Sequence, residues 1–346
     1  MKHQTTRYGE IPFYKIGTFG NTADAFISKK LFLEYKTKYS FPKKGDILIS
    51  ASGTIGKAVI YDGKPAYFQD SNIVWIDNDE TLVKNDFLFY AYSNVKWNTE
   101  HTTILRLYND NFRNTLIPLP PLNEQSAIAN VLSGLDRYLC ALDALILKKE
   151  SVKKALSFEL LSQRKRLKGF NQAWQRVRLG DIANYLTSNL SVEQITQQGE
   201  IKVYDVNNFI GYTDTTFISD KPYISIVKDG SVGRVRILPP KTNILSTMGA
   251  LIANHRTTTE FLFYLLSNFD FKNFTSGSII PHIYFKDYKE KTIFLPPLNE
   301  QSAIANVLSG LDNEIASLKN KKRQFENIKK ALNHDLMSAK IRVLEK

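Results

Sequence analysis

The chain contains one eighteen-residue segment twice, letter for letter, at residues 119–136 and 295–312. The match continues beyond the copy, because residues 153–156 and 329–332 are also identical at the same offset of 176 residues. Looser similarities connect the parts that differ, such as the glycine-bearing turns at 53–57 and 230–234. The 346 residues therefore form a two-fold tandem repeat, and their number suits two or three domains.

Each repeat ends in a constant half that predicts a long helix. Asn123 and Asn299 follow a Pro-Pro stop and are predicted helix N-caps. Apolar residues then recur with heptad spacing at Ile128, Leu132, Leu135, Leu139, Leu142 and Ile146, and in the same phase at Ile304, Leu308, Leu311, Ile315 and Leu318. Such a seam needs a partner helix, and the two helices of one chain most simply pair with each other.

The variable half of each repeat predicts a globule of mixed secondary structure. Apolar runs bounded by glycine turns, at 46–50 and 58–61, are typical of strands, whereas 86–94 and 258–268 predict short apolar helices. The fold class is therefore α+β, with two globules in tandem and a long helix after each. The predicted limits are 1–118, 119–169, 170–294 and 295–346, the first and third being globules and the other two helices.

The charge of the chain indicates a polyanionic partner. A formal net charge of +12 is unusual for a folded protein and makes nucleic acid the first expectation. No run of about 18 apolar residues and no apolar leader is present, which predicts a soluble cytoplasmic protein. The single cysteine, Cys140, excludes an internal disulfide and is expected to be a core thiol.

Motifs of catalysis are missing from the sequence. Residues 51–58 resemble a phosphate-binding loop, but Ala51 and Ala58 stand where that loop has glycine and a hydroxyl residue. Every Pro-Pro pair follows leucine, so no adenine-methyltransferase tetrapeptide occurs, and the five histidines lack metal-ligand spacing. The sequence thus predicts a chain without catalysis, metal or cofactor.

The paired Leu-Pro-Pro-Leu-Asn-Glu-Gln helix starts, the two glycine turns and the segments 106–108 and 282–284 resemble the specificity subunit of Type I restriction-modification systems. The resemblance covers almost the whole chain. It implies two target recognition domains, each reading one half of a bipartite duplex sequence, and an antiparallel coiled-coil spacer that sets the gap. It also implies docking of two adenine-specific modification (methyltransferase) subunits and of translocating restriction subunits. S-adenosylmethionine, ATP and Mg would then belong to those partners.

Candidate contacts follow from these segments. Polar and basic side chains on glycine-bearing loops can reach phosphates and base edges. The predicted DNA-binding residues are Ser52, Thr54, Lys57, Arg106, Tyr108, Ser231, Arg234, Arg236, Ser278, His282 and Tyr284. The predicted partner-binding residues are Asn123, Glu124, Gln125, Asn299, Glu300 and Gln301. The alternative interpretation makes Tyr108 and Tyr284 core aromatics, the glycines simple turn residues, and Lys57 and Arg234 solvated charges.

The two globules differ at their start. Aligning Gly9 with Gly199 leaves the first globule without a counterpart of residues 174–190, so a sheet edge and some core should be exposed. A second hypothesis follows: a truncated homologue that cannot bind DNA and acts as an assembly or interaction protein for modification subunits. A salt-dependent binding assay separates this hypothesis from the DNA reader.

Overall fold

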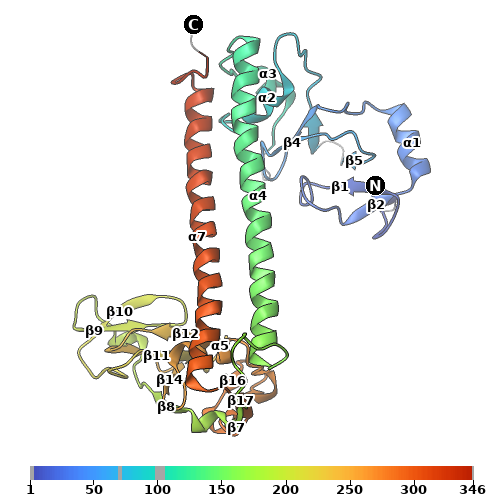
Figure 1. The fold of residues 1–346 in the computed structure, drawn as a ribbon. Coiled ribbons are helices and arrows are strands. Elements are labelled where there is room, and N and C mark those ends of the chain that lie inside the picture. Colours follow the sequence, from blue (N-terminus) through green and yellow to red (C-terminus); the bar gives the residue numbers. More distant parts are fainter. Residues whose placement is uncertain (1–3, 69–71, 98–105, 345–346) are drawn as a thin grey trace. The chain divides into compact units, whose positions relative to one another are not determined.

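The protein is described by a computed structural model covering residues 4–68, 72–97 and 106–344. It divides into two compact units, residues 1–143 with 320–346 (unit 1) and residues 144–319 (unit 2). Each unit contains one globule, the first half of the helix that follows it and the second half of the other helix (Figure 1). Both helices lie inside the ranges predicted for them. The prediction of four consecutive segments did not anticipate that each unit contains half of each long helix.

The globule of unit 1 holds two small sheets. One has the order β2-β1-β5, and the other has the order β4-β3-β6. The strands are β1 (Ile11–Tyr14), β2 (Ala25–Ile27), β3 (Ile47–Ser50), β4 (Ala58–Ile60), β5 (Tyr67–Phe68) and β6 (Ile73–Trp75). The helices are α1 (Lys29–Lys38), α2 (Asn85–Tyr92) and α3 (Asn109–Arg113).

The globule of unit 2 repeats this plan with more strands. Its largest sheet has the order β12-β11-β14-β8, beside sheets β10-β9-β13, β17-β7 and β15-β16. The strands are β7 (Gln175–Arg178), β8 (Ala183–Thr187), β9 (Ile201–Tyr204), β10 (Phe209–Thr213), β11 (Tyr223–Val227), β12 (Val235–Leu238), β13 (Thr242–Ile244), β14 (Met248–Ala253), β15 (Thr275–Ser276), β16 (His282–Ile283) and β17 (Thr292–Leu295). The helices are α5 (Thr259–Ser267) and α6 (Phe285–Tyr288), with 3-10 turns at Leu179–Asp181, Val192–Gln194 and Lys272–Phe274.

The long helices are α4 (Leu122–Leu161) and α7 (Leu298–Met337), and within each unit their halves pair antiparallel. Lys329 binds Asp136 in unit 1, and the equivalent Lys153 lies 2.5 Å from Asp312 in unit 2. The predicted α+β class, the tandem globules and the helix pair are confirmed. Most of the heptad seam is buried as well, at Ile128, Leu132, Leu142, Ile146, Ile304, Leu308 and Ile315.

Two local predictions were wrong. The helices begin at Leu122 and Leu298, because the amides of Gln125 and Gln301 already donate to the carbonyls of the prolines before them. Asn123 therefore lies inside the first turn of α4, where its side chain accepts a hydrogen bond from the next amide. Cys140 is exposed, because a helix pair buries one stripe of each helix and this residue lies outside it.

The hydrophobic core is unequal in the two units. In unit 2 one cluster joins the largest sheet, α5, β7, β17 and the helix residues Leu160 and Leu308. In unit 1 the corresponding residues divide into separate clusters, one around Leu132 and Phe87 and another around Ile47 and Leu88. Among the described residues, no helix is both long and apolar enough to cross a membrane.

Candidate nucleic-acid interface

Two loops that are distant in sequence form one surface in unit 2. The turn after β11 meets the segment that leads into β16, since the Gly230 amide donates to the Pro281 carbonyl and the Ile283 amide donates to the Lys228 carbonyl, both at 2.9 Å. The Asp229 carboxylate lies 2.6 Å from Nδ1 of His282. The sequence supplied these loops as separate motifs, and the fold places them together.

The same pair of loops recurs in unit 1. Ser52 forms an isolated β-bridge with Arg106, just as Asp229 does with His282. The Leu107 amide donates to the Ala51 carbonyl at 2.8 Å. Each unit therefore presents a glycine turn joined to a second segment at equivalent positions, while the side chains on the two pairs of loops differ.

The two arginines predicted to contact DNA, Arg234 and Arg236, have hydrogen-bond partners inside the protein. Arg234 donates to the side-chain oxygen of Asn207 at 2.9 Å, and Arg236 donates to the backbone carbonyl of the same residue at 3.0 Å. Arg236 also lies over the Tyr204 ring, 5.3 Å from its centroid. These contacts attach the turn to the β9–β10 hairpin. Because each guanidinium carries five N–H donors, most of them remain available to a ligand.

Lys57 makes the corresponding attachment in unit 1, where its ammonium donates to the Phe19 carbonyl. Lys57 and Arg234 are therefore more than solvated charges. Asn207 was not predicted as a site residue, and neither was Asp229. Both lie in ordinary polar turns. They are recognised as site residues only because the fold brings Arg234 to Asn207 and His282 to Asp229.

The remaining predicted DNA contacts divide by exposure. Ser52, which we predicted as a DNA contact, is buried in this structure, and its backbone carbonyl accepts a hydrogen bond from the Ser50 hydroxyl at 2.8 Å. Tyr108 and Tyr284 are 44% and 49% exposed, which excludes the core-aromatic interpretation. Exposed side chains also belong to Thr54, Arg106, Ser231 and Ser278. Sequence reasoning missed Ile279, which is 92% exposed beside this surface.

The predicted partner-binding residues mostly hold each globule on its helix. Gln301 accepts from the Thr258 amide at 3.0 Å and donates to the Arg256 and Pro296 carbonyls. Gln125 makes the same set of bonds in unit 1, with the Lys84 amide and the Leu82 and Pro120 carbonyls.

Glu300 also faces inward, because it accepts from Arg166 at 2.6 and 3.0 Å and from the Trp174 indole at 3.0 Å. Its equivalent Glu124 accepts from Arg342. We expected these four Gln and Glu side chains to contact a partner subunit, but all four are buried in this structure. Asn123 and Asn299 remain exposed.

The ion pair between Glu124 and Arg342 predicts that the stability of unit 1 depends on pH. Hydrogen bonding from Arg342 is the main reason that the pKa of the Glu124 carboxyl lies below its ordinary value of 4.5. Ionised Glu124 therefore stabilises unit 1 above that ordinary pKa, and this stabilisation is lost as the pH falls through the lowered value. Urea unfolding between pH 7 and 3 should show the loss, and Glu124→Gln should flatten it. An unchanged pH profile in the variant would contradict the assignment.

Comparison with known proteins gives these repeated sites a family. The chain matches the family described as "Type I restriction modification DNA specificity domain" over residues 1–150 and 171–327. The chain belongs to this family. The two matched ranges correspond to the two repeats, and each includes most of the long helix, α4 or α7, that ends its repeat.

Individual relatives in the specificity family agree with this assignment. The putative type I restriction enzyme specificity subunit S.HindORF215P of Haemophilus influenzae is 63% identical over 137 residues, covering 39% of this chain and 36% of that protein. The putative MjaX specificity subunit of Methanocaldococcus jannaschii is 28% identical over 86% of this chain and 79% of its own length.

Solved structures agree on the fold. The S subunit of a Type I restriction-modification system from M. genitalium has a TM-score of 0.63 at 20% identity, over 97% of this chain and 91% of that one. A chain from a study of assembly and conformational transition of the type I system has a TM-score of 0.56 at 17% identity, over 85% and 82% of the two chains.

Proposed function

We propose that this chain is the DNA-reading subunit of a Type I restriction-modification complex. Each loop pair reads one half of a bipartite duplex sequence, and the paired helices hold the two readers. The chain itself is non-catalytic. Two adenine-specific modification subunits dock on it, restriction subunits join them, and S-adenosylmethionine, ATP and Mg are bound by those partners.

One observation carries the proposal: the two loop pairs occupy equivalent positions in the repeat but present different side chains. Arg106 stands where the second repeat has His282, and Lys57 stands where it has Arg234. The hydrogen bonds of Gln125 and Gln301 are equivalent in the two units. A scaffold that stays constant while its loops change is what two readers of different half-sites require.

The chemistry of the loops supports contact with duplex DNA. Arg234 and Arg236 carry unused N–H donors that suit phosphate oxygens, and His282 is a group that can bond to base edges. The net charge of +12 favours the same partner. Phosphate contacts position a protein on DNA, whereas base contacts select the sequence, so the two kinds of residue should respond differently to substitution.

Selection from a randomised duplex library tests the proposal. The purified chain should enrich a bipartite sequence, and its affinity should fall steeply as salt rises. The double variant Arg234→Ala with Arg236→Ala should weaken binding to all sequences and reduce the salt slope by about one for each phosphate that is no longer neutralised. His282→Ala should relax sequence preference in one half-site only.

The matched control is Arg178→Ala, because Arg178 is bound to Asp181 and Glu290, remote from the loops in sequence. It should leave the salt slope unchanged. Adenine methylation should appear only after modification subunits are added, so methylation or cleavage by the chain alone contradicts the proposal. Failure to bind duplex DNA would favour the assembly protein instead.

A further inference from the structure

The imidazole of His282 is held in one orientation by its surroundings in unit 2. Its Nδ1 lies 2.6 Å from the carboxylate of Asp229. Its Cδ2 borders Gly277, since a Cβ added to that glycine would lie 3.0 Å from it. The Tyr284 ring stacks beside it, with 6.5 Å between the ring centroids and 21° between the planes. The His282 side chain is 35% exposed, so part of this fixed ring is open to a ligand.

The bond between Asp229 and His282 is not needed to join the two loops. Backbone hydrogen bonds between the loops already connect them. In unit 1 the equivalent bridge pairs Ser52 with Arg106, and a backbone hydrogen bond connects those loops as well. Two loops of this kind are thus joined without a carboxylate at the bridge, and Asp229 requires another explanation.

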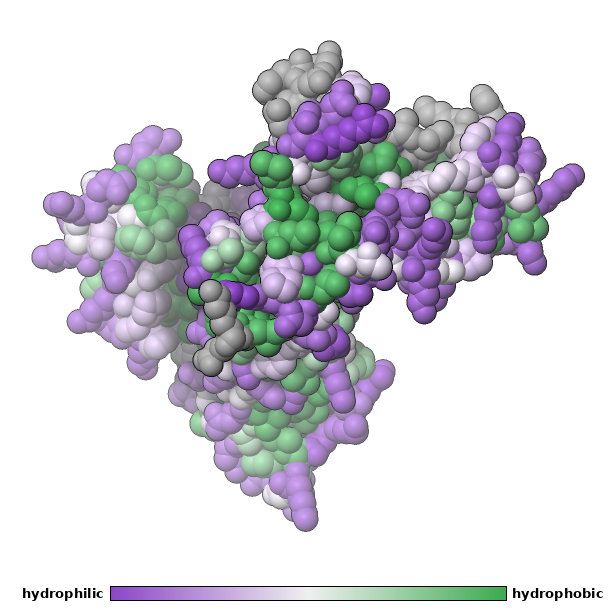
Figure 2. All heavy atoms as spheres, turned by 90° about the horizontal axis from the view of Figure 1, so that it is seen from above, coloured by the Kyte–Doolittle hydropathy of each residue, from purple (hydrophilic) through white to green (hydrophobic). Residues whose placement is uncertain are grey.

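Exposed polar side chains are common on this protein, and hydrophilic residues lie beside hydrophobic ones on the face that Figure 2 views. Polarity alone therefore does not mark a reading residue. A carboxylate differs from other polar groups, because it repels the phosphate oxygens of an approaching duplex. The benefit of Asp229 at a surface that meets DNA must come from the group that it binds.

The Asp229 carboxylate fixes which nitrogen of the His282 ring carries a hydrogen. An ionised carboxylate only accepts hydrogen bonds, so Nδ1 is the donor of the 2.6 Å bond. A neutral imidazole has one N–H and one nitrogen lone pair, and here the lone pair belongs to Nε2. The ring therefore offers Nε2 to a ligand as a hydrogen-bond acceptor.

We propose that Asp229 is the positioning residue that sets the base preference of the unit 2 half-site, an inference that rests on the proposed function. Asp229 holds the hydrogen of His282 on Nδ1, and Nε2 accepts from an exocyclic amino group in the major groove. Adenine and cytosine present such a group there. Guanine and thymine present acceptors and cannot make this bond.

Unit 1 has the opposite chemistry at the equivalent position. Arg106 carries N–H donors and no acceptor, so it suits the two major-groove acceptors of guanine. The two half-sites should therefore differ at this base: guanine for unit 1, and adenine or cytosine for unit 2.

Selection from a randomised duplex library compares the full chain with three variants. The wild-type chain should enrich adenine or cytosine at one position of the unit 2 half-site. His282→Ala and Asp229→Ala should each reduce that preference about two- to tenfold, the range of one hydrogen bond. Asp229→Asn should keep most of it, because its amide oxygen still accepts from Nδ1. Selection in the unit 1 half-site should not change.

Base analogues test the bond itself. Purine in place of adenine, or 2-pyrimidinone in place of cytosine, removes only the amino group. This change should weaken binding of the wild-type chain about two- to tenfold and should hardly affect His282→Ala or Asp229→Ala, which have already lost the bond. The analogue that acts also distinguishes adenine from cytosine.

Nitrogen-15 NMR of the full chain detects the tautomer without DNA. At about pH 8, above the range in which histidine usually titrates, the His282 signals should show a hydrogen on Nδ1 and none on Nε2. In Asp229→Ala a substantial fraction of the rings should carry the hydrogen on Nε2. The signals are assigned by their loss in His282→Ala.

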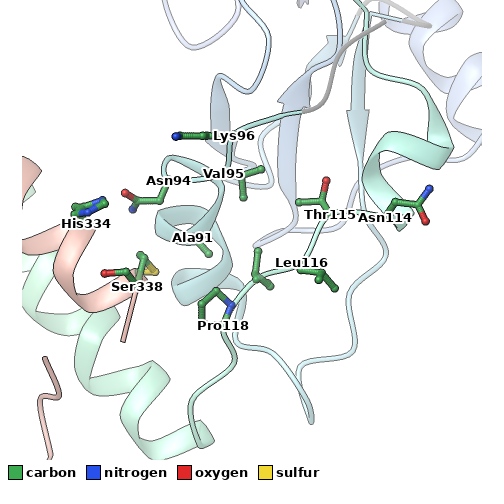
Figure 3. Close-up of a pocket in the computed structure, with 12 residues that line it drawn as sticks. Ala91, Asn94, Val95, Lys96, Asn114, Thr115, Leu116, Pro118, His334 and Ser338 are labelled. Atoms are coloured by element: carbon green, nitrogen blue, oxygen red, sulfur yellow. The ribbon is translucent and has the colours of Figure 1, made fainter. Parts of the chain in front are cut away.

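His334 provides a matched control. It lies near the end of α7 in unit 1, beside a pocket of about 490 Å³ that residues 114–118 and the end of α2 also line (Figure 3). His334→Ala removes another exposed imidazole, but one that belongs to neither reading loop. Base selection in both half-sites and the salt slope should stay unchanged.

The outcomes separate this inference from the proposed function. If the wild-type chain binds no duplex DNA, the proposed function fails and the inference fails with it. If the chain binds a bipartite sequence but Asp229→Ala selects the same base as strongly, only the inference is overturned. A hydrogen on Nε2 in the wild-type chain, or Asp229→Asn behaving like Asp229→Ala, also overturns it. Faster hydrogen exchange at the Gly230 and Ile283 amides in Asp229→Ala would make the pair structural and do the same.

Discussion

Replacing Leu308 with alanine is expected to lower the free energy of unfolding of unit 2 by about 2–5 kcal/mol. Leu308 is fully buried in the cluster that also holds Phe261 and Leu251, where the sheet, α5 and α7 meet. Removing three carbon atoms there leaves a cavity that close-packed neighbours fill only in part. Urea unfolding, followed by hydrogen exchange to assign the loss to unit 2, measures the effect.

The repeat provides a matched variant and a matched control. Leu132→Ala removes the equivalent, fully buried side chain in unit 1, and its effect should be confined to that unit. Val307→Ala changes the neighbouring residue of the same helix, which is 37% exposed, and should cost much less. A loss from Val307→Ala as large as that from Leu308→Ala would contradict the dominance of core packing, because alanine is the better helix former and helix propensity alone would favour the variant.

Replacing Gly233 with alanine should distort the candidate reading loop of unit 2. Gly233 has a φ of 80°, and an added Cβ would lie 2.6 Å from the ring of Phe271, which is buried. The left-handed backbone costs about 1–2 kcal/mol for a residue with a side chain. Overpacking against the ring adds about 1–3 kcal/mol, so the turn is expected to move.

The displaced turn should weaken sequence-specific binding at least about tenfold, which is the discrimination that roughly one good base contact supplies. Gly230→Ala is the control, because Gly230 has a φ of 83° but open space where its Cβ would lie. The Gly230→Ala variant should show only the backbone strain, and its affinity for DNA should fall less than that of Gly233→Ala. Equal losses of stability in the two variants would contradict the importance of the Phe271 ring.

The helix pair and the tandem globules could be predicted because their signals are local and repeated. Leu132 and Leu308 belong to a heptad pattern that needs no knowledge of the rest of the fold. The glycine turns were located for the same reason. Exact helix starts were missed, because proline carbonyls and asparagine side chains compete for the same amides and the sequence does not decide between them.

The candidate site was predicted less well. Exposed Tyr108 and Tyr284 fit the prediction, whereas Ser52 is buried and the Glu124 and Glu300 carboxylates face inward. Residue type suggests what a side chain can bind, but not which direction it faces. A carboxylate at a helix start suits a partner protein or an arginine of the same chain equally well, and the position of Arg166 and Arg342 depends on where the opposite helix ends.

The sequence by itself determined the duplication, the paired helices, the α+β class and the family, because periodicity and an identical copy are properties of the chain. Only the tertiary structure joined Asp229 to His282 and Ser52 to Arg106, and only it placed Gln125 and Gln301 beneath the globules. These features depend on contacts between residues far apart in the chain, which form only when sheets and helices pack.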